Sequence, residues 1–306
     1  MTHSVKQSLE WPLEVVGTGF TALDRVVSED HVSIETLGGS CGNVLISLAM
    51  LGRRVAPVLE LGDDDTAARL IEEFLEAGTD TTYVRRRQGM TTPIVEQTND
   101  RATGQHRFSF VCGAHGGGRA SYQPATRLLF EKAYRAVTCC RVFYADRTNT
   151  DILWTMRLAK EKGATVIFEP SDFSDRAAVD EACSVADIVK VSSDRLKSDI
   201  LRSAQFVIVT HGSRGLELIS SDASSWFPAV EASRFEDACG SGDMVTVALI
   251  DALLSSDGRR QETALHETVA RGLMLGQRVA AANCAYVGAR GMFRVEGSPY
   301  VRALLA

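Results

Sequence analysis

Short apolar runs alternate with amphipathic segments along most of this chain. The apolar runs predict a strand beginning at 15–17 and further strands over 55–61, 141–145, 164–168, 188–191 and 206–210. Amphipathic segments between them predict helices over 64–77, 151–162 and 177–185. Nearly continuous apolar strands are expected to be buried on both faces, as in a parallel sheet covered by crossover helices. The pattern therefore predicts an α/β fold with a mostly parallel sheet between two helical layers.

Two stretches depart from this alternation. Residues 31–37 form a short β-like run, and residues 92–111 resemble two strands around a polar turn at 98–104. Both suit a small β-sheet that projects from the main body. The last third of the chain, at 241–256 and 261–286, is rich in Ala, Leu and Val and is predicted to be helical.

Composition narrows the classes of partner. The 306-residue chain is 45% hydrophobic and 24% charged, has a net charge of −6, and has its densest basic patch at Arg85–Arg87. Contacts along a nucleic acid need clustered positive charge, so no nucleic-acid surface is expected. No apolar run approaches the ~18 residues of a membrane span, and residues 1–11 lack the apolar core of a signal peptide. The seven cysteines include no CxxC pair, which argues against a disulfide framework or a zinc site. We therefore expect a cytoplasmic protein without a membrane segment.

Three glycine-rich turns lie next to predicted strands or helices, and the turn at 237–243 carries the most chemistry. It reads Asp-Ala-Cys-Gly-Ser-Gly-Asp and opens a predicted helix. The backbone N–H groups of Gly240, Ser241 and Gly242 could converge there on an anion, assisted by the helix dipole. Asp243 lies at the mouth of that anion site, where a carboxylate is useful if it takes a proton from a hydroxyl that attacks phosphorus. The alternative is that Asp243 only caps the helix. If Gly242 needs a positive φ, a side chain there would also strain the backbone.

The first glycine-rich turn, at 38–43, precedes an apolar helix and could place its backbone and Asn43 beside a polyhydroxyl ligand. Its string Gly-x-Ser-x-Gly at 38–42 also fits the nucleophile elbow of α/β-hydrolases. Ser40 is therefore a candidate hydrolase nucleophile. Against this hypothesis, an elbow is expected after several core strands, and the turn at 237–243 would be left unexplained.

Taken together, these turns resemble the ribokinase (PfkB) family of carbohydrate kinases over nearly the whole chain. Gly38-Gly39-x-x-x-Asn43 before an apolar helix is similar to the family's N-terminal signature. Asp237-x-x-Gly240-x-Gly242-Asp243 is similar to its C-terminal signature, with Ser241 where alanine is usual. Weaker similarities lie at Leu61-Gly62-Asp63-Asp64, at Thr210-x-Gly212-x-x-Gly215, and at 19–24, which resembles the end of the family's first strand.

The resemblance implies one Rossmann-like αβα sandwich domain over 1–306, with a small β-sheet lid from segments near 27–38 and 90–113. It implies transfer of the γ-phosphoryl group of ATP to a hydroxyl of a small sugar-like substrate, with Asp243 as general base and 240–242 as anion hole. It also implies substrate binding by Asp24, Gly38, Gly39 and Asn43, and ATP binding by Thr210, Gly212, Gly215 and Asn283. Mg²⁺ would bridge the phosphates, K⁺ is a further candidate cofactor, and a homodimer is expected because such lids often pair between subunits.

The chain departs from the family pattern around the metal. The family's N-x-x-E motif reads Ser-Ser-Asp-Arg at 192–195, so Arg195 replaces its glutamate. A strand end that often carries Asp or Asn carries Glu169 instead. Because Mg²⁺ prefers oxygen ligands and keeps several waters, we expect Glu169 or Asp194 to take over this role, with Glu169 preferred. A ligand-binding pseudokinase of the same fold is the alternative, and Arg195 is its best argument.

Overall fold

The main sheet extends the parallel arrangement that the apolar runs predict. The computed structural model describes residues 13–28, 31–99, 106–111, 122–196, 204–221, 223–256 and 262–306. Within these ranges the main sheet has eight strands in the order β14-β13-β12-β11-β10-β9-β1-β4. Their bounds are β1 Val15–Thr18, β4 Val55–Pro57, β9 Val142–Ala145, β10 Thr165–Phe168, β11 Ile188–Ser192, β12 Phe206–Thr210, β13 Gly215–Ile219 and β14 Ser224–Pro228. In this order, the six neighbouring strands from β12 to β4 are parallel to one another. The β13–β14 hairpin adds an antiparallel edge.

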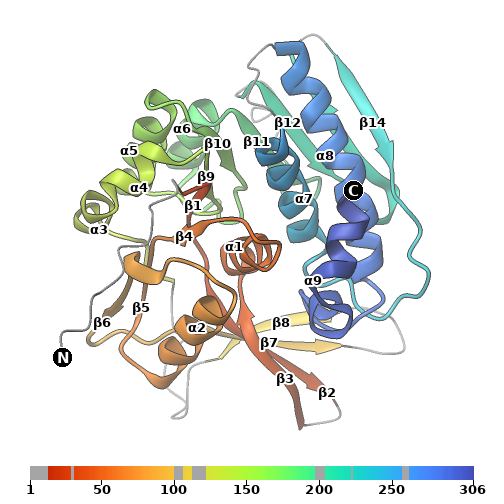
Figure 1. The fold of residues 1–306 in the computed structure, drawn as a ribbon. Coiled ribbons are helices and arrows are strands. Elements are labelled where there is room, and N and C mark those ends of the chain that lie inside the picture. Colours follow the sequence, from red (N-terminus) through yellow and green to blue (C-terminus); the bar gives the residue numbers. More distant parts are fainter. Residues whose placement is uncertain are drawn as a thin grey trace, which may run out of the picture.

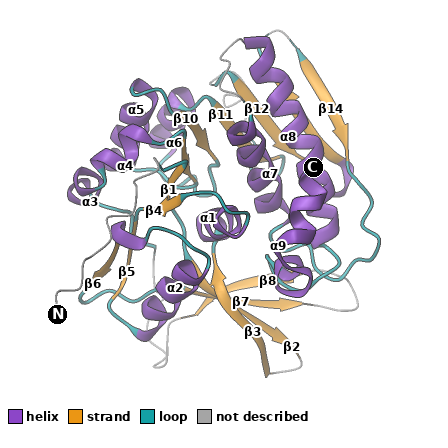
Figure 2. Ribbon diagram, in the orientation of Figure 1, coloured by secondary structure: helices purple, strands orange, loops and turns teal. Residues whose placement is uncertain are grey.

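Helical layers cover both faces of this sheet, because successive strand residues point to opposite sides. Val15 and Ile167 belong to the core under one layer, whereas Val16 and Phe168 belong to the core under the other. The first layer contains α1 (Ser40–Met50), α2 (Asp65–Glu76), α7 (Ser241–Ser255), α8 (Glu262–Asn283) and α9 (Gly291–Leu305). The second contains α3 (Arg127–Lys132), α4 (Tyr134–Cys139), α5 (Thr150–Glu161) and α6 (Arg176–Val185). The αβα sandwich is thus confirmed (Figure 2). None of the helices in the described ranges is long and apolar enough to cross a membrane.

A small separate sheet projects from the sandwich beside α1 and α2 (Figure 1). It contains β3 (His31–Gly38), β2 (Ala22–Ser28), β7 (Ile94–Asn99) and β8 (His106–Val111), in that order. The predicted small sheet is confirmed, and we call it the lid sheet. Strand β2 was not predicted, because Asp24 and Arg25 interrupt its apolar pattern. Most of the predicted turn at 98–104, and residues 29–30 and 112–113 of the predicted lid segments, lie outside the described residues.

The single strand predicted over 55–61 is wrong, because the chain divides there into two strands in different sheets. Strand β4 pairs with β1 and ends at Pro57, which has no N–H with which to extend the ladder. The next strand, β5 (Leu59–Gly62), pairs instead with β6 (Val84–Arg87) in a two-stranded parallel sheet. The chain therefore leaves the main sheet immediately before α2.

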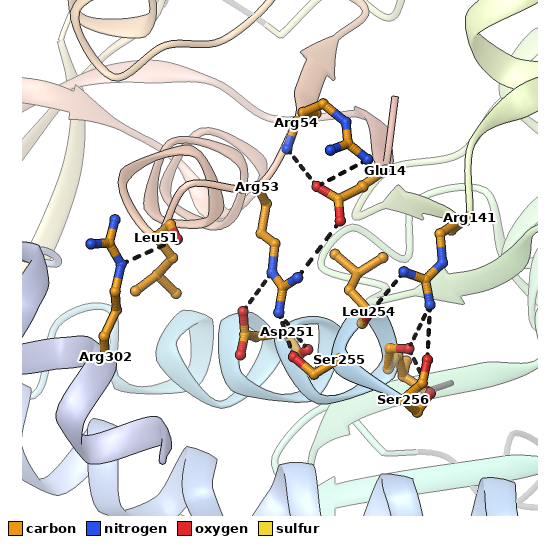
Figure 3. A network of polar contacts seen from close by, with 11 residues as sticks. Glu14, Leu51, Arg53, Arg54, Arg141, Asp251, Leu254, Ser255, Ser256 and Arg302 are labelled. Carbon is orange, nitrogen blue, oxygen red and sulfur yellow. Dashed lines mark hydrogen bonds and ion pairs between the residues drawn. The ribbon is translucent and has the colours of Figure 1, made fainter. Parts of the chain in front are cut away.

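Two arginines from other elements fix the C-terminal end of α7 (Figure 3). Arg141 donates to the main-chain oxygens of Leu254 at 2.7 Å and Ser256 at 3.2 Å. Nε of Arg53 donates to the carboxylate of Asp251 at 2.7 Å. Cationic donors at this end satisfy carbonyls that have no partner within the helix and oppose its negative dipole. The anchored helix carries the glycine-rich turn at its opposite, N-terminal end.

We expect Arg141→Ala to lower the free energy of unfolding by about 1–2 kcal/mol, since it leaves several helix-end carbonyls without donors. Urea unfolding followed by circular dichroism measures the change. The matched control is Arg157→Ala on α5, whose ion pair with Glu181 is half exposed and is expected to contribute under ~1 kcal/mol. Equal effects of the two substitutions would contradict this assignment.

Candidate active site

The starts of α1 and α7 meet at the carboxyl-terminal edge of the main sheet. Asn43 lies in the first turn of α1 and Asp243 in the first turn of α7. The Nδ2 group of Asn43 donates to Oδ2 of Asp243 at 2.8 Å, although 200 residues separate them. The packing of α1 against α7 makes this contact possible (Figure 1). The structure thus brings together one residue from each of the two glycine-rich signatures.

The glycines of the 237–243 turn have different functions. Gly240 is the N-cap of α7 with φ 71°, and a Cβ there would lie 2.6 Å from main-chain atoms of Ala289. Gly242 has no positive φ, so strain at that position is not expected, and an added Cβ would meet only Nζ of Lys190, at 3.7 Å. The N–H of Ser241 donates to the oxygen of Ala238 at 3.2 Å. Within the described chain, the N–H groups of Gly240, Gly242 and Asp243 have no acceptor and are the donors left for an anion.

The environment of Asp243 raises the pKa of its carboxyl group to about 8. Burial is the main cause, and the neighbouring carboxylate of Glu169 raises the pKa further. The ammonium of Lys190 and the hydrogen bond from Asn43 lower it. A carboxylate with a pKa near the working pH can accept a proton in a reaction, which an ordinary exposed aspartate does poorly.

A buried lysine that sequence reasoning missed lies directly below this helix start. Lys190 of β11 is only 3% exposed and forms an ion pair with Glu169. Its Nζ also donates to the main-chain oxygen of Gly242 at 3.1 Å. The hydroxyl of Thr246 donates to the second oxygen of Glu169 at 2.8 Å. The signal in the sequence was a charged residue inside an apolar strand, since buried lysines are rare unless paired.

The predicted substrate residues lie where β2 and β3 of the lid sheet approach α1. Asp24 lies on β2, not at the end of the first strand, and the pKa of its carboxyl group is raised to about 6 by burial, against a lowering effect of Arg290. A Cβ at Gly38 would lie 1.9 Å from Cγ of Asp24. Gly39 caps α1 with φ 77°. Both glycines are therefore required locally, whatever they bind.

Asp237, the first residue of the second signature, connects three parts of the site. It is 2% exposed. Its carboxylate accepts hydrogen bonds from the N–H of Cys239 at 2.9 Å, from the N–H of Gly288 at 2.9 Å, and from Nε2 of Gln97 at 2.8 Å. Because Gln97 belongs to β7, this carboxylate connects the lid sheet to the helix start. The sequence analysis placed Asp237 in the second signature but predicted no function for it.

The predicted nucleotide residues lie at the end of β12, in the turn that follows it, and at the last residue of α8. Thr210 ends β12, and Gly212 follows with φ 59° and no neighbour within 4 Å of an added Cβ. Gly215 is instead required for packing, since its Cβ would lie 2.1 Å from the oxygen of Phe227. The side chain of Asn283 is fully buried and binds protein atoms. It donates to the oxygens of Cys239 and Ala289 at 3.2 Å each and accepts from the N–H of Met292 at 3.2 Å. Its amide therefore holds the loop in place and does not face an open site.

Glu169, the preferred metal ligand of the sequence analysis, has protein partners on its carboxylate. Both oxygens of Glu169 already bond to protein groups, since Tyr144 also donates to Oε2, at 3.3 Å. Asp194 is exposed in the turn after β11. Among the residues that the structure describes, no three His, Cys, Asp or Glu side chains form a group that could hold a metal ion. The arrangement gives Glu169 no free oxygen for direct coordination, so the preference for it over Asp194 loses its support.

Ser40 begins α1 and lies beside the buried carboxylate of Asp146. Asp146 itself accepts from the N–H of Phe20 at 2.8 Å and pairs with Arg147. The two histidine side chains that the structure describes make other contacts. His211 packs against Trp226 and His266 against Phe206, at 5.1 and 6.0 Å between ring centroids. These contacts give the hydrolase hypothesis no support.

Comparison with known proteins decides between these classes. The family model described as pfkB family carbohydrate kinase matches residues 23–294. The chain belongs to the pfkB family of carbohydrate kinases. Fructokinase-1 of Oryza sativa subsp. japonica is 24% identical over 262 residues, which covers 77% of this chain and 79% of the relative. The kinase class predicted from the two signatures is confirmed, and the hydrolase alternative is wrong.

Solved structures agree on the fold. A fructokinase with bound ATP from Xylella fastidiosa superimposes with a TM-score of 0.76 at 20% identity, over 95% of this chain and 98% of that one. Aminoimidazole riboside kinase from Salmonella enterica, complexed with aminoimidazole riboside and an ATP analogue, gives a TM-score of 0.73 at 18% identity, over 96% of this chain and all of the other. The ribokinase-like α/β fold is therefore confirmed.

Gly240→Ala and Gly242→Ala are expected to fail in different ways. Alanine at position 240 must take a left-handed φ against Ala289, so we expect a loss of about 1–3 kcal/mol in unfolding free energy. Alanine at position 242 should leave the stability within ~1 kcal/mol but lower kcat, since its methyl lies beside the anion-binding N–H groups. Urea unfolding and kinase assays separate the two effects. A Gly242→Ala enzyme with unchanged kcat would contradict the anion site.

Proposed function

We propose that this kinase transfers the γ-phosphoryl group of ATP to a hydroxyl of a sugar or sugar-like molecule, with Asp243 as general base. The observation that carries the proposal is a carboxylate with a raised pKa in the first turn of a helix whose first N–H groups have no acceptor within the described chain. A carboxylate there weakens the binding of a resting phosphate. It is useful when a hydroxyl must lose its proton as it attacks.

The proposed step uses the two oxygens of Asp243 differently. Oδ2 is held by Asn43, so Oδ1 takes the proton of the attacking hydroxyl. The new bond forms between that hydroxyl oxygen and the γ-phosphorus, and the bond to the β,γ-bridging oxygen breaks to release ADP. The N–H groups of Gly242 and Asp243 bind the oxygens of the transferred group, where negative charge must be stabilised. Lys190 lies beneath Gly242 and supplies a fixed positive charge nearby.

The substrate and nucleotide are proposed to enter from opposite sides of the start of α7. Asp24, Gly38, Gly39 and Asn43 lie on the lid side and would hold the hydroxyl groups of the substrate. The end of β12, with Thr210 and Gly212, would hold ATP, in keeping with the ATP and ATP analogue bound to the two solved relatives. Gly215 and Asn283 would act indirectly, by shaping the loops around that site.

We propose that the substrate class is sugars and nucleosides. Proteins similar to this chain support this breadth, because they include fructokinases, an aminoimidazole riboside kinase, and a nucleoside kinase from Burkholderia thailandensis in complex with inosine. The dimer and the cytoplasmic location stay predictions.

Mg²⁺ is proposed to arrive with ATP and to be held by phosphate oxygens and water. Since Glu169 is paired with Lys190, it would reach the ion only through water, and the exposed Asp194 is the better protein contact. Bound there, the ion would neutralise charge on the phosphates. The need for K⁺ stays a prediction.

Asp243→Asn is expected to lower kcat by about 100- to 10,000-fold because the base is lost. The assay is ADP release coupled to NADH oxidation, over a panel of sugars, sugar acids and nucleosides with Mg²⁺ and K⁺. ATP binding, measured by calorimetry, should survive. The matched control is Asp251→Asn, which lies further along the same helix and pairs with Arg53. Near-normal turnover by a folded Asp243→Asn enzyme would overturn the assignment, and nucleotide binding by the unaltered chain without turnover on the panel would indicate a pseudokinase.

Asp194→Asn is expected to raise the Mg²⁺ concentration for half-maximal rate several-fold and to leave kcat at saturating Mg²⁺ unchanged, as for the loss of one outer contact. Glu169→Gln is measured in parallel and should mainly lower stability, because it leaves Lys190 buried without its carboxylate. Asp180→Asn, on the exposed face of α6, is the control. If neither Asp194→Asn nor Glu169→Gln changes the Mg²⁺ requirement, no protein carboxylate of this pair serves the metal.

A further inference from the structure

Arg290 is a buried cation next to the proposed site, at the start of α9. The residue is 6% exposed although it carries a full positive charge. Its guanidinium donates to Oδ1 of Asn43 and to the hydroxyl of Thr36, the latter at 2.8 Å. Its third neighbour is the carboxylate of Glu73 on α2, at 3.7 Å. A buried arginine is costly unless its donors are used, so this position is built to keep those contacts.

The contact with Asn43 fixes the direction of a side chain that could otherwise point either way. An amide has an oxygen that only accepts and an NH₂ group that only donates. A guanidinium has donors alone, so it must face the amide oxygen. The NH₂ group of Asn43 is thereby turned toward Asp243, to which it donates at 2.8 Å. With the amide reversed, its oxygen would face the carboxylate and repel it.

The same guanidinium is tied to the lid sheet. The hydroxyl of Thr36, on β3, donates to Oε2 of Glu73 at 2.8 Å, and the N–H of Leu37 donates to the same oxygen at 2.8 Å. Arg290 therefore contacts β3 and α2 on one side and Asn43 on the other. A continuous set of polar contacts runs from the lid sheet to the base.

We propose that Arg290 is a positioning residue for phosphoryl transfer: it orients the amide of Asn43 toward Asp243 and connects that orientation to strand β3 of the lid sheet. This inference rests on the proposed function, because it gives Asp243 the part of the base. It goes beyond that function in assigning a new residue and in coupling the lid sheet to the base. Nothing in the two glycine-rich signatures points to Arg290, which lies outside both.

Several charged groups surround Asp243 and bear on any pH-dependent test. These are Asp146 and Glu169, which directly follow β9 and β10, Lys190 from β11 and Arg290 just before α9, and Asp24 from β2 acts on Arg290 in turn. Burial also raises the pKa values of Tyr144, Cys41 and Cys239 well above their usual ranges, so these groups stay neutral through the pH range of an assay. Asp24 does titrate near neutral pH, with a carboxyl pKa of about 6 that Arg290 lowers, so a direct reading of Asp243 is needed beside the pH profile of the rate.

The test compares Arg290→Met with Arg290→Gln. Both remove the charge, but only the glutamine can still donate to the oxygen of Asn43. A cavity of about 470 Å³ between α1, α2 and α9 borders this position and leaves room for either side chain. The matched control is Arg294→Met, one turn along α9, which lines the same cavity and whose guanidinium donates to the oxygen of Val287 at 2.7 Å. Circular dichroism and thermal unfolding establish that each variant is folded.

With the best substrate of the panel, Arg290→Met is expected to lower kcat by about 10- to 100-fold with little change in the KM for ATP. Arg290→Gln should recover a large part of kcat, and Arg294→Met should resemble the unaltered enzyme. In the profile of kcat/KM against pH, the rate rises as Asp243 loses its proton, and the midpoint should move to higher pH in Arg290→Met. A kcat within twofold of normal in folded Arg290→Met, with an unmoved midpoint, would overturn the inference.

A second measurement needs no substrate. The carboxyl ¹³C resonance of Asp243, assigned by its loss in Asp243→Asn, reports the pKa of that group directly. Loss of the oriented hydrogen bond should raise this pKa by about 0.5–1 pH unit in Arg290→Met, and by less in Arg290→Gln. Equal shifts in the two variants would mean that only the charge matters, which contradicts the orienting function. The proposed function fails separately, through an active Asp243→Asn enzyme, whereas an inactive Asp243→Asn with a normal Arg290→Met refutes this inference alone.

Discussion

The packing of α1 against α7 is the constraint on which the site depends. Each helix begins with a glycine of positive φ, Gly39 or Gly240, and each presents its first turn at the same edge of the sheet. The two polar side chains that meet there, Asn43 and Asp243, come from signatures 200 residues apart. The arginines at the far end of α7 hold this helix along its axis. The site is thus positioned by buried helices and not by loops alone, which keeps its geometry fixed when substrates exchange.

The second feature is the cost of bringing several charged side chains together at a largely buried helix start. Asp243, Glu169, Lys190 and Arg290 all lie around the start of α7, and burial opposes the charged form of Asp243 and Arg290 alike. The folded-state pKa of Asp243 lies above its ordinary value of 3.8. Between about pH 4 and pH 8 the group ionises in the unfolded chain but keeps its proton in the folded one, so the stability of the fold falls as the pH rises. This loss of stability accompanies a carboxylate that can accept a proton near neutral pH. The ion pair of Lys190 with Glu169 and the donors around Arg290 limit the cost.

Much of the main sheet could be predicted from the sequence, because apolar strands and amphipathic helices leave strong periodic signals. Strand β2 was missed because Asp24 and Arg25 interrupt its apolar pattern, and the break at Pro57 was missed because the apolar run continues past it into a strand of another sheet. Asp243 and Asn43 were found because they belong to glycine-rich motifs. Arg290 was not singled out, because its importance comes from contacts with residues far away in the chain, and Lys190 was passed over although a charge inside an apolar strand marks it. Asn283 shows the opposite error. Its place in the sequence predicted a nucleotide contact, but its amide makes its hydrogen bonds inside the protein.

The parallel pairing of β2 with β7 has a consequence for the order of folding. Leu23 lies opposite Ile94, so α1, β4, α2, β5 and β6 all lie between the two strands along the chain. Pairing β2 with β7 closes a long loop. The entropic cost of closing it is smaller once the intervening segment is already compact. We therefore expect the β2–β3 hairpin to form early. The edge of β2 that later pairs with β7 then stays unpaired until the intervening segment has folded and β7 has been synthesised. During translation this unpaired edge of β2 is exposed to pairing with a neighbouring molecule.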